Sequence, residues 1–241
     1  GCCVEKVEVA DGGEGTMEAL HRTLGGVKVA VEVCDPLGRP ITASYVILAD
    51  GVTAVLEMAV ASGLPLLSVE ERNPLKTSTY GTGQLIADAL SKGCRKFLVG
   101  IGGSATNDAG MGMLEALGVK FYDAEGKVLA GRGENLERVE DISMADVCEG
   151  LLESSFVVAC DVDAPLYGLR GAAYVFAPQK GADEDMVIRL DNGLKHFSLS
   201  VSRVLGKDVS MLPGAGAAGG VGGGFVAFLP ARLERGIEMV L

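Results

Sequence analysis

The sequence predicts an α/β protein with a doubly wound, mostly parallel sheet and helices on both of its faces. Segments typical of strands and helices alternate along the 241 residues, which is the pattern of βαβ units. Residues 97–99 and 156–160 are apolar throughout, as in strands at the middle of a parallel sheet. Ligands of such sheets bind at the carboxyl ends of the strands. The polar loops after Ala10, Gly100 and Cys160 are therefore the candidate functional segments.

Each element follows from a local pattern. Strands are expected where apolar residues alternate or run together, helices where they recur at helical spacing, and turns at clusters of glycine, proline and aspartate. The first predicted elements are a strand at 4–10, a helix at 16–24 with Thr16 as N-cap, antiparallel strands at 27–33 and 41–48, an apolar helix at 52–62 and a helix at 84–91.

The second half of the chain continues the alternation, interrupted by one small hairpin and an acidic loop. The predicted elements are a strand at 97–99, a helix at 109–117 capped by Asn107 or Asp108, a hairpin at 119–122 and 127–129, a loop with a short surface helix at 131–153, strands at 156–160 and 173–177, an amphipathic helix at 183–205 and a buried helix at 220–229.

The composition excludes several classes of protein. A net charge of −11 and an isoelectric point near 4.7 disfavour nucleic acid and anionic membranes as partners, because their phosphate groups would repel the chain. The uncharged segment 213–231 is too rich in glycine for a membrane helix. Six cysteines without a CxxC pair indicate reduced thiols and a cytoplasmic location. Two histidines far apart exclude a histidine-rich metal site.

The most informative segment is 97–118, a strand followed by a glycine loop and a helix. Gly102 and Gly103 allow a sharp turn and a close approach of the backbone to a ligand. Free N–H groups and the positive end of a helix dipole at such a point favour a phosphate or carboxylate. A plain strand-to-helix turn is the alternative. The short polar side chains that follow the glycines are those of Ser104, Thr106, Asn107 and Asp108.

A second loop, ADGGEGT at 10–16, places Asp11 at a strand end and Glu14 in a glycine turn before a helix. Such a pair could hold Mg²⁺, which prefers one or two carboxylates together with phosphate oxygens, or could orient a substrate hydroxyl. The alternative is an acidic first helical turn that complements the dipole.

A third loop, CDVDAPL at 160–166, sets Asp161 and Asp163 two residues apart at the end of a buried strand. These carboxylates are candidate metal ligands or a general base, and the alternative is a turn before the proline. In APQKGA, at 177–182, Lys180 could pair with a phosphate as a point charge, or could simply be solvated.

Two more segments leave their role open. Residues 213–224, PGAGAAGGVGGG, could bring the backbone close to a ligand or allow tight packing between elements. The hydroxyl-rich loop at 76–83, KTSTYGTG, could donate to a phosphate or could be a plain capped loop.

Six of these segments, in this order, resemble the bacterial type I glycerate kinase family: ADGGEGT, NPLKTSTYGTG, GIGGSATNDAGMGM, CDVDAPL, APQKGA and PGAGAAGGVG. The resemblance spans nearly the whole chain. It implies transfer of a phosphoryl group from ATP to a hydroxyl of D-glycerate with Mg²⁺, with 2-phosphoglycerate favoured over 3-phosphoglycerate as the product.

The resemblance also implies two α/β domains, one inserted into the other, with the active site in the cleft between them. Residues 1–25 are then a remnant of the discontinuous domain, 26–235 the inserted flavodoxin-like domain, and 236–241 the start of the return. A segment with Asp-Ser-Phe/Tyr-Lys is expected before Gly1, and one with Gly-Glu-Gly after Leu241. The chain is therefore expected to be truncated at both ends, which bears on whether it closes a competent cleft.

Site residues follow from the resemblance motif by motif. Asp11 and Asp161 are the expected catalytic carboxylates, as a base or as Mg²⁺ ligands. Small departures from the family pattern occur at Ala109, at Asp163-Ala164 and at Ala177, so Asp163 is not assigned a role. The expected substrate- and phosphate-binding residues are Gly12, Gly13, Glu14, Gly15, Thr16, Thr77, Gly102, Gly103, Ser104, Thr106, Asn107, Asp108, Gln179, Lys180, Gly214 and Gly216.

Two rival functions remain at this point. One is a non-catalytic flavodoxin-like module that binds a phosphorylated ligand or a flavin, and the other is an inactive fragment of the kinase. The expected partners are D-glycerate and ATP, without nucleic acid or membrane, and the sequence leaves a homodimer open.

Overall fold

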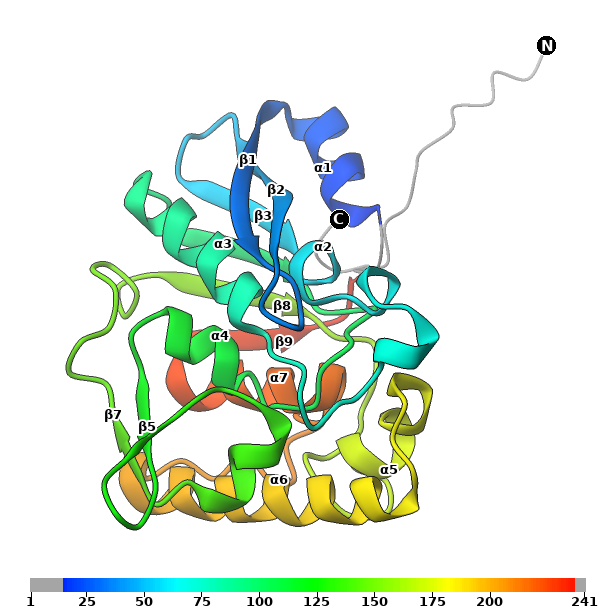
Figure 1. Cartoon of the computed structure of the whole chain (residues 1–241). Helices are drawn as coiled ribbons and strands as arrows, with labels where there is room; N and C mark the ends of the chain where they lie inside the picture. Colours follow the sequence, from blue (N-terminus) through cyan, green and yellow to red (C-terminus); the bar gives the residue numbers. More distant parts are fainter. Residues whose placement is uncertain (1–14, 237–241) are drawn as a thin grey trace.

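The protein is built around one six-stranded sheet, seen in the computed structural model, which describes residues 15–236 (Figure 1). The strand order is β1-β2-β3-β4-β8-β9. From β3 to β9 neighbouring strands are parallel, whereas β1 and β2 pair antiparallel at one edge. The mixed α/β architecture with a mostly parallel sheet is therefore confirmed. The strands are β1 (Gly26–Cys34), β2 (Pro40–Leu48), β3 (Thr53–Glu57), β4 (Lys96–Gly100), β8 (Ser155–Ala159) and β9 (Ala231–Glu234).

Helices connect these strands. The α-helices are α1 (Thr16–Leu24), α2 (Ala59–Ser62), α3 (Tyr80–Ser91), α4 (Met111–Ala116), α5 (Ala172–Phe176), α6 (Glu184–Leu205) and α7 (Ala217–Phe228). The 3₁₀ turns are η1 (Leu64–Leu66), η2 (Val69–Glu71), η3 (Gly133–Arg138) and η4 (Pro178–Lys180). A small second sheet, in the order β6-β5-β7, contains β5 (Lys120–Tyr122), β6 (Val128–Leu129) and β7 (Asp141–Ser143).

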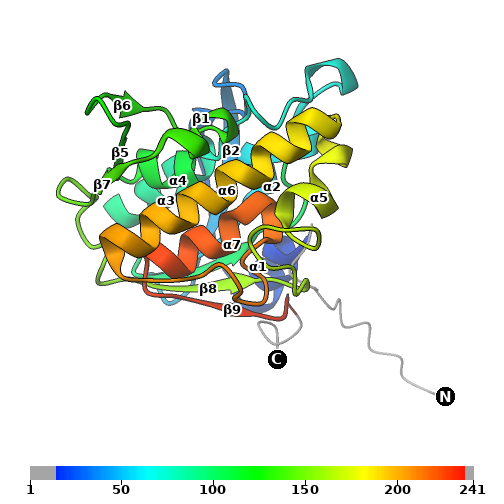
Figure 2. The same cartoon turned by 90° about the horizontal axis from the view of Figure 1, so that it is seen from below.

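The main hydrophobic core lies between the sheet and the layer that contains α3, α4 and α7, with α6 outermost (Figure 2). Alternate strand residues point into it, and the rings of Phe97 in β4 and Phe156 in β8 stack with centroids 4.6 Å apart. The other face carries a smaller cluster, in which Met17 and Leu20 of α1 pack with Val46 and Val55. Helices thus cover both faces unevenly.

Two predicted elements are wrong. Residues 52–62 form β3 and the short α2 instead of one helix, because a fully buried apolar strand has no alternation to distinguish it from a buried helix. Residues 173–177 form α5 instead of a strand. Its aromatic and β-branched residues, Tyr174 and Val175, look strand-like but are exposed, while the preceding alanines are buried in the core.

The helix starts also differ in detail. Gly15, with φ of 92°, is the N-cap of α1, so the predicted cap at Thr16 is wrong by one residue. The structure places α1 against β2 and β3. How residues 1–25, 26–235 and 236–241 divide between domains stays a prediction.

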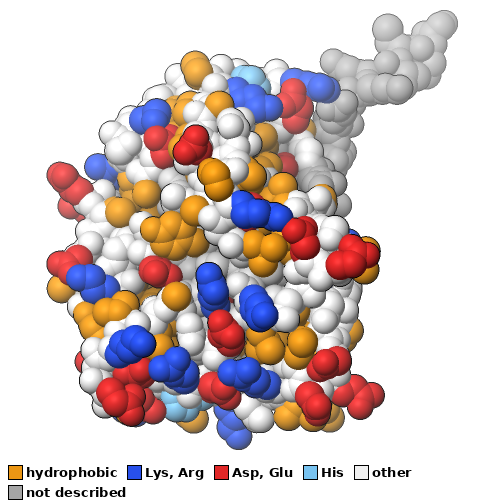
Figure 3. Space-filling view, in the orientation of Figure 1, with side chains coloured by type: hydrophobic (Ala, Val, Ile, Leu, Met, Phe, Trp, Pro, Cys, Tyr) orange, Lys and Arg blue, Asp and Glu red, His pale blue; other side chains and the backbone are white. Residues whose placement is uncertain are grey.

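The surface agrees with the acidic, mixed composition. On the described part of the face drawn in Figure 3, acidic and basic side chains are interspersed. Within residues 15–236, no helix is long and apolar enough to cross a membrane. The four described cysteines form no disulfide with one another.

Candidate functional site

A cavity of about 390 Å³ lies at the carboxyl edge of the parallel strands, where the loops after β4 and β8 meet η4 and the start of α7. This is the edge where α/β sheets bind ligands. These segments lie far apart in the sequence. The predicted site residues that line the cavity are Gly102, Gly103, Ser104, Asp161, Gln179 and Lys180.

The glycine loop after β4 is held open by backbone contacts. Gly103 has φ of 71°, and its carbonyl accepts a hydrogen bond of 2.8 Å from the N–H of Leu64. The N–H of Ala105 donates to Ser62, and the Thr77 hydroxyl donates to the Ala105 carbonyl at 2.9 Å. Thr77 is fully buried, so it supports the loop from behind rather than lining the cavity.

Lys180 is the cation of the cavity. Its side chain is only 2% exposed, and its Nζ donates to the Ser104 hydroxyl and to the Thr106 carbonyl, both at 2.7 Å. Burial lowers the pKa of this ammonium to about 7, although the nearby Asp108 carboxylate acts in the opposite direction. An ammonium has three donors, and the described residues accept two of them, which leaves one for the cavity.

Asp108 lies behind the loop and does not line the cavity. It is fully buried, and its Oδ2 accepts hydrogen bonds of 2.8 Å from both the N–H and the hydroxyl of Thr79. The N–H groups of Gly110 and Gly112 donate to the same carboxylate at 3.1 and 3.2 Å. Burial raises the pKa of Asp108, whereas these hydrogen bonds lower it.

The predicted N-cap of α4 is corrected by this geometry. The helix starts at Met111, two residues later than predicted, and Gly110 with φ of 74° occupies the cap position. Asp108 nevertheless accepts from the first turn, because its side chain reaches forward to Gly110 and Gly112. Ala109, where the sequence departs from a common glycine, has the positive φ of 52° that glycine favours.

Thr106 and Asn107 are buried without side-chain partners. Both are 0% exposed, and the Thr106 hydroxyl and both polar atoms of the Asn107 amide have no hydrogen-bond partner among the described residues. Neither residue lines the cavity. Their predicted contact with a ligand stays a prediction, and the unpartnered atoms mark this loop as unusual, since buried polar groups are normally bonded.

The glycine-rich segment before and inside α7 provides close backbone packing. Ala218, Gly219 and Gly220 have left-handed conformations, with φ of 53°, 71° and 94°. A Cβ on Gly219 would lie 2.1 Å from the Thr106 carbonyl oxygen. Only glycine therefore lets α7 approach the loop after β4 this closely. Gly214 and Gly216 pack against Cys160 and Pro165 and do not line the cavity.

Asp161 is the described carboxylate that lines the cavity. It is exposed, and its Oδ1 accepts a hydrogen bond of 3.1 Å from the N–H of Gly236, just after β9. Within residues 15–236 there is no cluster of three metal-type side chains. Mg²⁺ bound by one or two carboxylates and by phosphate oxygens needs no such cluster, so Asp161 suits a magnesium ligand.

The loop at 10–16 is described only in part. Asp11, Gly12, Gly13 and Glu14 lie outside the described residues, and Gly15 is an exposed cap of α1. Sequence reasoning missed Glu57 at the carboxyl end of β3, because this segment was predicted as helix. Glu57 is 8% exposed and accepts a hydrogen bond of 2.9 Å from the N–H of Met17 in α1. The available signal was a polar residue at the end of a short apolar run.

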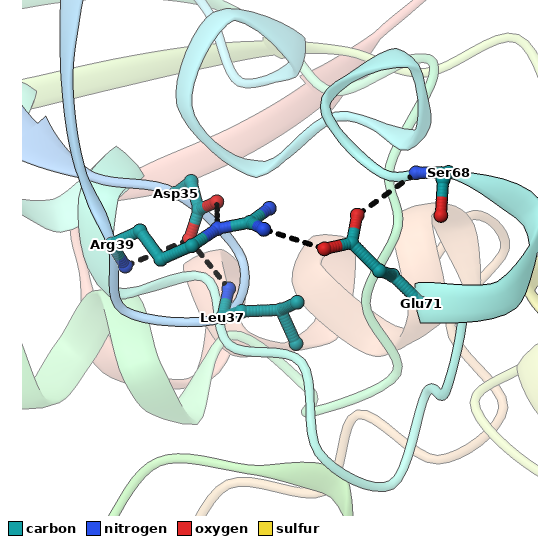
Figure 4. Close-up of polar contacts among 5 residues, drawn as sticks. All are labelled: Asp35, Leu37, Arg39, Ser68 and Glu71. Atoms are coloured by element: carbon teal, nitrogen blue, oxygen red, sulfur yellow. Dashed lines mark hydrogen bonds and ion pairs between the residues drawn. The ribbon is translucent and has the colours of Figure 1, made fainter.

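A charged cluster joins the β1–β2 turn to η2, and Figure 4 shows it. Asp35 accepts from the N–H groups of Leu37 and Arg39 at 2.8 and 2.9 Å, and its other oxygen pairs with the Arg39 guanidinium. Arg39 also pairs with Glu71 of η2, and Glu71 accepts from the N–H of Ser68. The next residue after η2, Arg72, packs against Gly181. The ion pair of Arg39 with Glu71 fixes the β1–β2 turn to η2.

The fold and the cavity define an α/β protein with a cavity at the carboxyl edge of its parallel strands, lined by a glycine loop and a buried lysine. The glycerate kinase family model matches residues 1–241. A glycerate kinase of Halalkalibacterium halodurans is 48% identical over 98% of this chain and 62% of its own length. The glycerate 2-kinase of Escherichia coli K12 is 48% identical over 97% of this chain and 61% of its own length.

A crystal structure from Salmonella typhimurium LT2, provisionally described as glycerate kinase 2, superposes with a TM-score of 0.95 at 46% identity. The match covers 98% of this chain and 63% of that one. The chain belongs to the glycerate kinase family, as the motifs predicted. It spans a little over three fifths of the length of these relatives.

Proposed function

We propose that the chain carries the substrate site of a glycerate kinase, which transfers the γ-phosphoryl group of ATP to a hydroxyl of D-glycerate in the bacterial cytoplasm. The observation that carries this proposal is the corner formed by Lys180 and the glycine loop, in a member of this family. The name of the Escherichia coli relative favours the 2-hydroxyl as the acceptor.

The main polar groups of the cavity each have a proposed task. The N–H groups after Gly102 and the hydroxyl of Ser104 bind a phosphate or the glycerate carboxylate, and Lys180 neutralises its charge. In the reaction the terminal phosphorus–oxygen bond of ATP breaks, a new bond to the substrate oxygen forms, and the hydroxyl proton passes to a carboxylate. Asp161, with Asp11, is the proposed proton acceptor or Mg²⁺ ligand, and Mg²⁺ supplies charge neutralisation at the phosphates.

Other predicted contacts are part of the same proposal. Contact with substrate or phosphate is also proposed for Gly12, Gly13, Glu14, Gly15, Thr16 and Gln179. A homodimer is proposed as well, and light scattering would test it. Thr77, Asp108, Gly214 and Gly216 are proposed to support the backbone around the cavity, because none of them lines it. Contact of Thr106 and Asn107 with a ligand stays a prediction.

Release of ADP from Mg-ATP, with and without D-glycerate, tests the proposal on this chain. Glycerate-dependent release is expected, and an Asp161→Asn variant should lose most of it. Release that ignores glycerate, or near-normal turnover of the variant, would contradict the assigned roles. Silence of the chain together with activity of a chain of the relatives' length would identify it as an incomplete enzyme. Yellow colour and visible absorbance would instead indicate a flavin-binding module.

A further inference from the structure

Glu57 is a buried carboxylate to which the proposed function assigns no role. It is the last residue of β3, at the carboxyl edge of the sheet. In the parallel pairing of β3 with β4 it lies beside Gly100, and the residues that follow Gly100 line the cavity. Charged side chains are rarely buried without a partner, so the position of Glu57 needs an explanation.

The partner of this carboxylate is the start of α1. Oε1 of Glu57 accepts a hydrogen bond of 2.9 Å from the N–H of Met17, the second residue of the helix. The N–H groups of a first helical turn have no partner within the helix, and the side chain of the N-cap residue often accepts from one of them. The N-cap of α1 is Gly15, which has no side chain to do so. Glu57 therefore supplies this cap from a strand 40 residues further along the chain.

The hydrogen bond adds direction to the apolar contact between α1 and the sheet. Met17 and Leu20 are buried in one cluster with Val55, which lies on the same side of β3 as Glu57. Apolar packing alone is non-directional, whereas the hydrogen bond fixes the first turn of α1 at the carboxyl end of β3. The positive end of the helix dipole also favours a negative charge at this point.

We propose that Glu57 is a positioning residue for phosphoryl transfer, which acts by fixing the first turn of α1 at the edge of the sheet where the cavity lies. The motif ADGGEGT, at 10–16, ends at the first residue of this helix. The inference rests on the proposed function in taking that motif, with Asp11, as part of the active site. Glu57 does not line the cavity, so it acts through α1.

Amide hydrogen exchange of Met17, followed by NMR, tests the anchor without turnover. An N–H in a first helical turn normally exchanges fast, so the hydrogen bond to Glu57 should slow exchange of Met17 by at least about tenfold. Glu57→Gln keeps a carbonyl oxygen as acceptor and should retain this protection, whereas Glu57→Ala should abolish it. Fast exchange of Met17 in the wild type would overturn the inference, even if Glu57→Ala does not fold.

Glycerate-dependent release of ADP tests the consequence for the reaction. It is measured on this chain or, if this chain is silent, on a chain of the relatives' length with the same substitutions. In Glu57→Ala we expect kcat to fall about 10- to 100-fold, because a displacement of about 1 Å in an active site can cost about 100-fold. The KM for D-glycerate should change by less than about threefold, since Lys180 and Ser104 belong to other segments. Glu57→Gln should keep kcat within about threefold of the wild type.

Asp183→Ala is the matched control. Asp183 is also a carboxylate that caps a helix, because it accepts a hydrogen bond of 2.8 Å from the N–H of Met186 in the first turn of α6. It does not line the cavity. Loss of this cap should lower the temperature of unfolding and leave kcat unchanged.

Three kinetic outcomes would overturn the inference. They are a wild-type kcat in Glu57→Ala, a fall of kcat in Asp183→Ala as large as in Glu57→Ala, and a fall in Glu57→Gln as large as in Glu57→Ala. The last would show that the charge of Glu57 acts directly. Absence of kinase activity in the wild type at the relatives' length, with Met17 protected from exchange, would contradict the proposed function alone.

Discussion

Two buried carboxylates in this molecule, Asp35 and Asp108, are treated differently by the chain. Asp35 is 3% exposed and pairs directly with the Arg39 guanidinium, which in turn pairs with Glu71 (Figure 4). The Asp108 carboxylate is bonded only to uncharged donors, and among the described residues Lys180 is bonded only to uncharged acceptors. The charges of Asp35, Arg39 and Glu71 pair with one another. Lys180, by contrast, lines the cavity without a charged partner among the described residues.

The ion-pair cluster of Asp35, Arg39 and Glu71, the hairpin cluster, has a counterpart in another turn of the chain. Asp123 accepts from the N–H groups of Glu125 and Lys127 and pairs with Arg138, which repeats the pattern of Asp35 in a second turn. Satisfied clusters of this kind stabilise turns. The loop around Lys180 departs from the pattern and, among the described residues, also contains unpartnered buried atoms of Thr106 and Asn107.

The largest expected effect is a loss of stability when the close packing of α7 on the loop after β4 is disturbed. Gly219→Ala should destabilise the fold by roughly 3 kcal/mol or more, because the new methyl group would meet the Thr106 carbonyl oxygen at 2.1 Å in a left-handed conformation. Denaturant unfolding measures the change. Gly206→Ala is the control: its φ is 69° but no atom lies within 4 Å of the new carbon, so a loss of only about 1 kcal/mol is expected. Equal losses would contradict the close packing.

A second prediction concerns the stability cost of the buried lysine. Lys180 has a pKa of about 7 in the folded chain, and an unfolded lysine has one near 10.4. Between these values the unfolded state binds more protons, so folding is penalised fully below pH 7 and less as the pH rises. Lys180→Met should therefore gain about 2 to 3 kcal/mol more stability at pH 6 than at pH 9. A gain that does not depend on pH would show that Lys180 is not desolvated.

The hairpin cluster provides the contrasting case. Asp35→Ala removes a side chain that accepts from two backbone N–H groups and from Arg39, and should cost roughly 1 to 3 kcal/mol of stability. Anion affinity of the folded variant should stay within about twofold of the wild type. Thermal unfolding and sulfate titration check the two parts. A large loss of affinity would mean that the two clusters are coupled.

The smallest expected effect is a change in stability from backbone strain at Ala109, in the loop between β4 and α4. Ala109 has φ of 52°, which is unfavourable for a residue with a Cβ atom. Ala109→Gly should stabilise the chain by roughly 0.5 to 1 kcal/mol if relief of strain exceeds the added freedom of the unfolded chain. Differential scanning calorimetry of the pair of proteins measures it, and a destabilised variant would contradict the strain.

The sequence predicted the fold where patterns were local. The β1–β2 hairpin, the buried strands β4 and β8 and the long amphipathic α6 were predicted close to their bounds, because alternation, apolar runs and helical spacing each indicate one structure. The strand β3 was missed because every one of its residues is buried. Its burial comes from neighbours on both sides, which no local window contains.

The site was predicted in part for the same reason. Gly102, Ser104, Asp161 and Lys180 do line one cavity, because the carboxyl ends of parallel strands meet at one edge. The sequence could not separate lining residues from supporting ones. Asp108 supports the loop from behind because it is bonded to Thr79, a residue 29 positions earlier that no local pattern connects to it.

We propose that Lys180, the cavity cation without a charged partner among the described residues, binds the anionic substrate. Arg39, which pairs with Asp35 and Glu71, has a structural role. Calorimetric titration with D-glycerate at pH 6.5, comparing the wild type with Lys180→Met and Arg39→Met, tests it directly. The loss of one charged hydrogen bond should weaken binding by about 30- to 100-fold in Lys180→Met, with Arg39→Met unchanged. Equal affinities of the wild type and Lys180→Met would contradict the account.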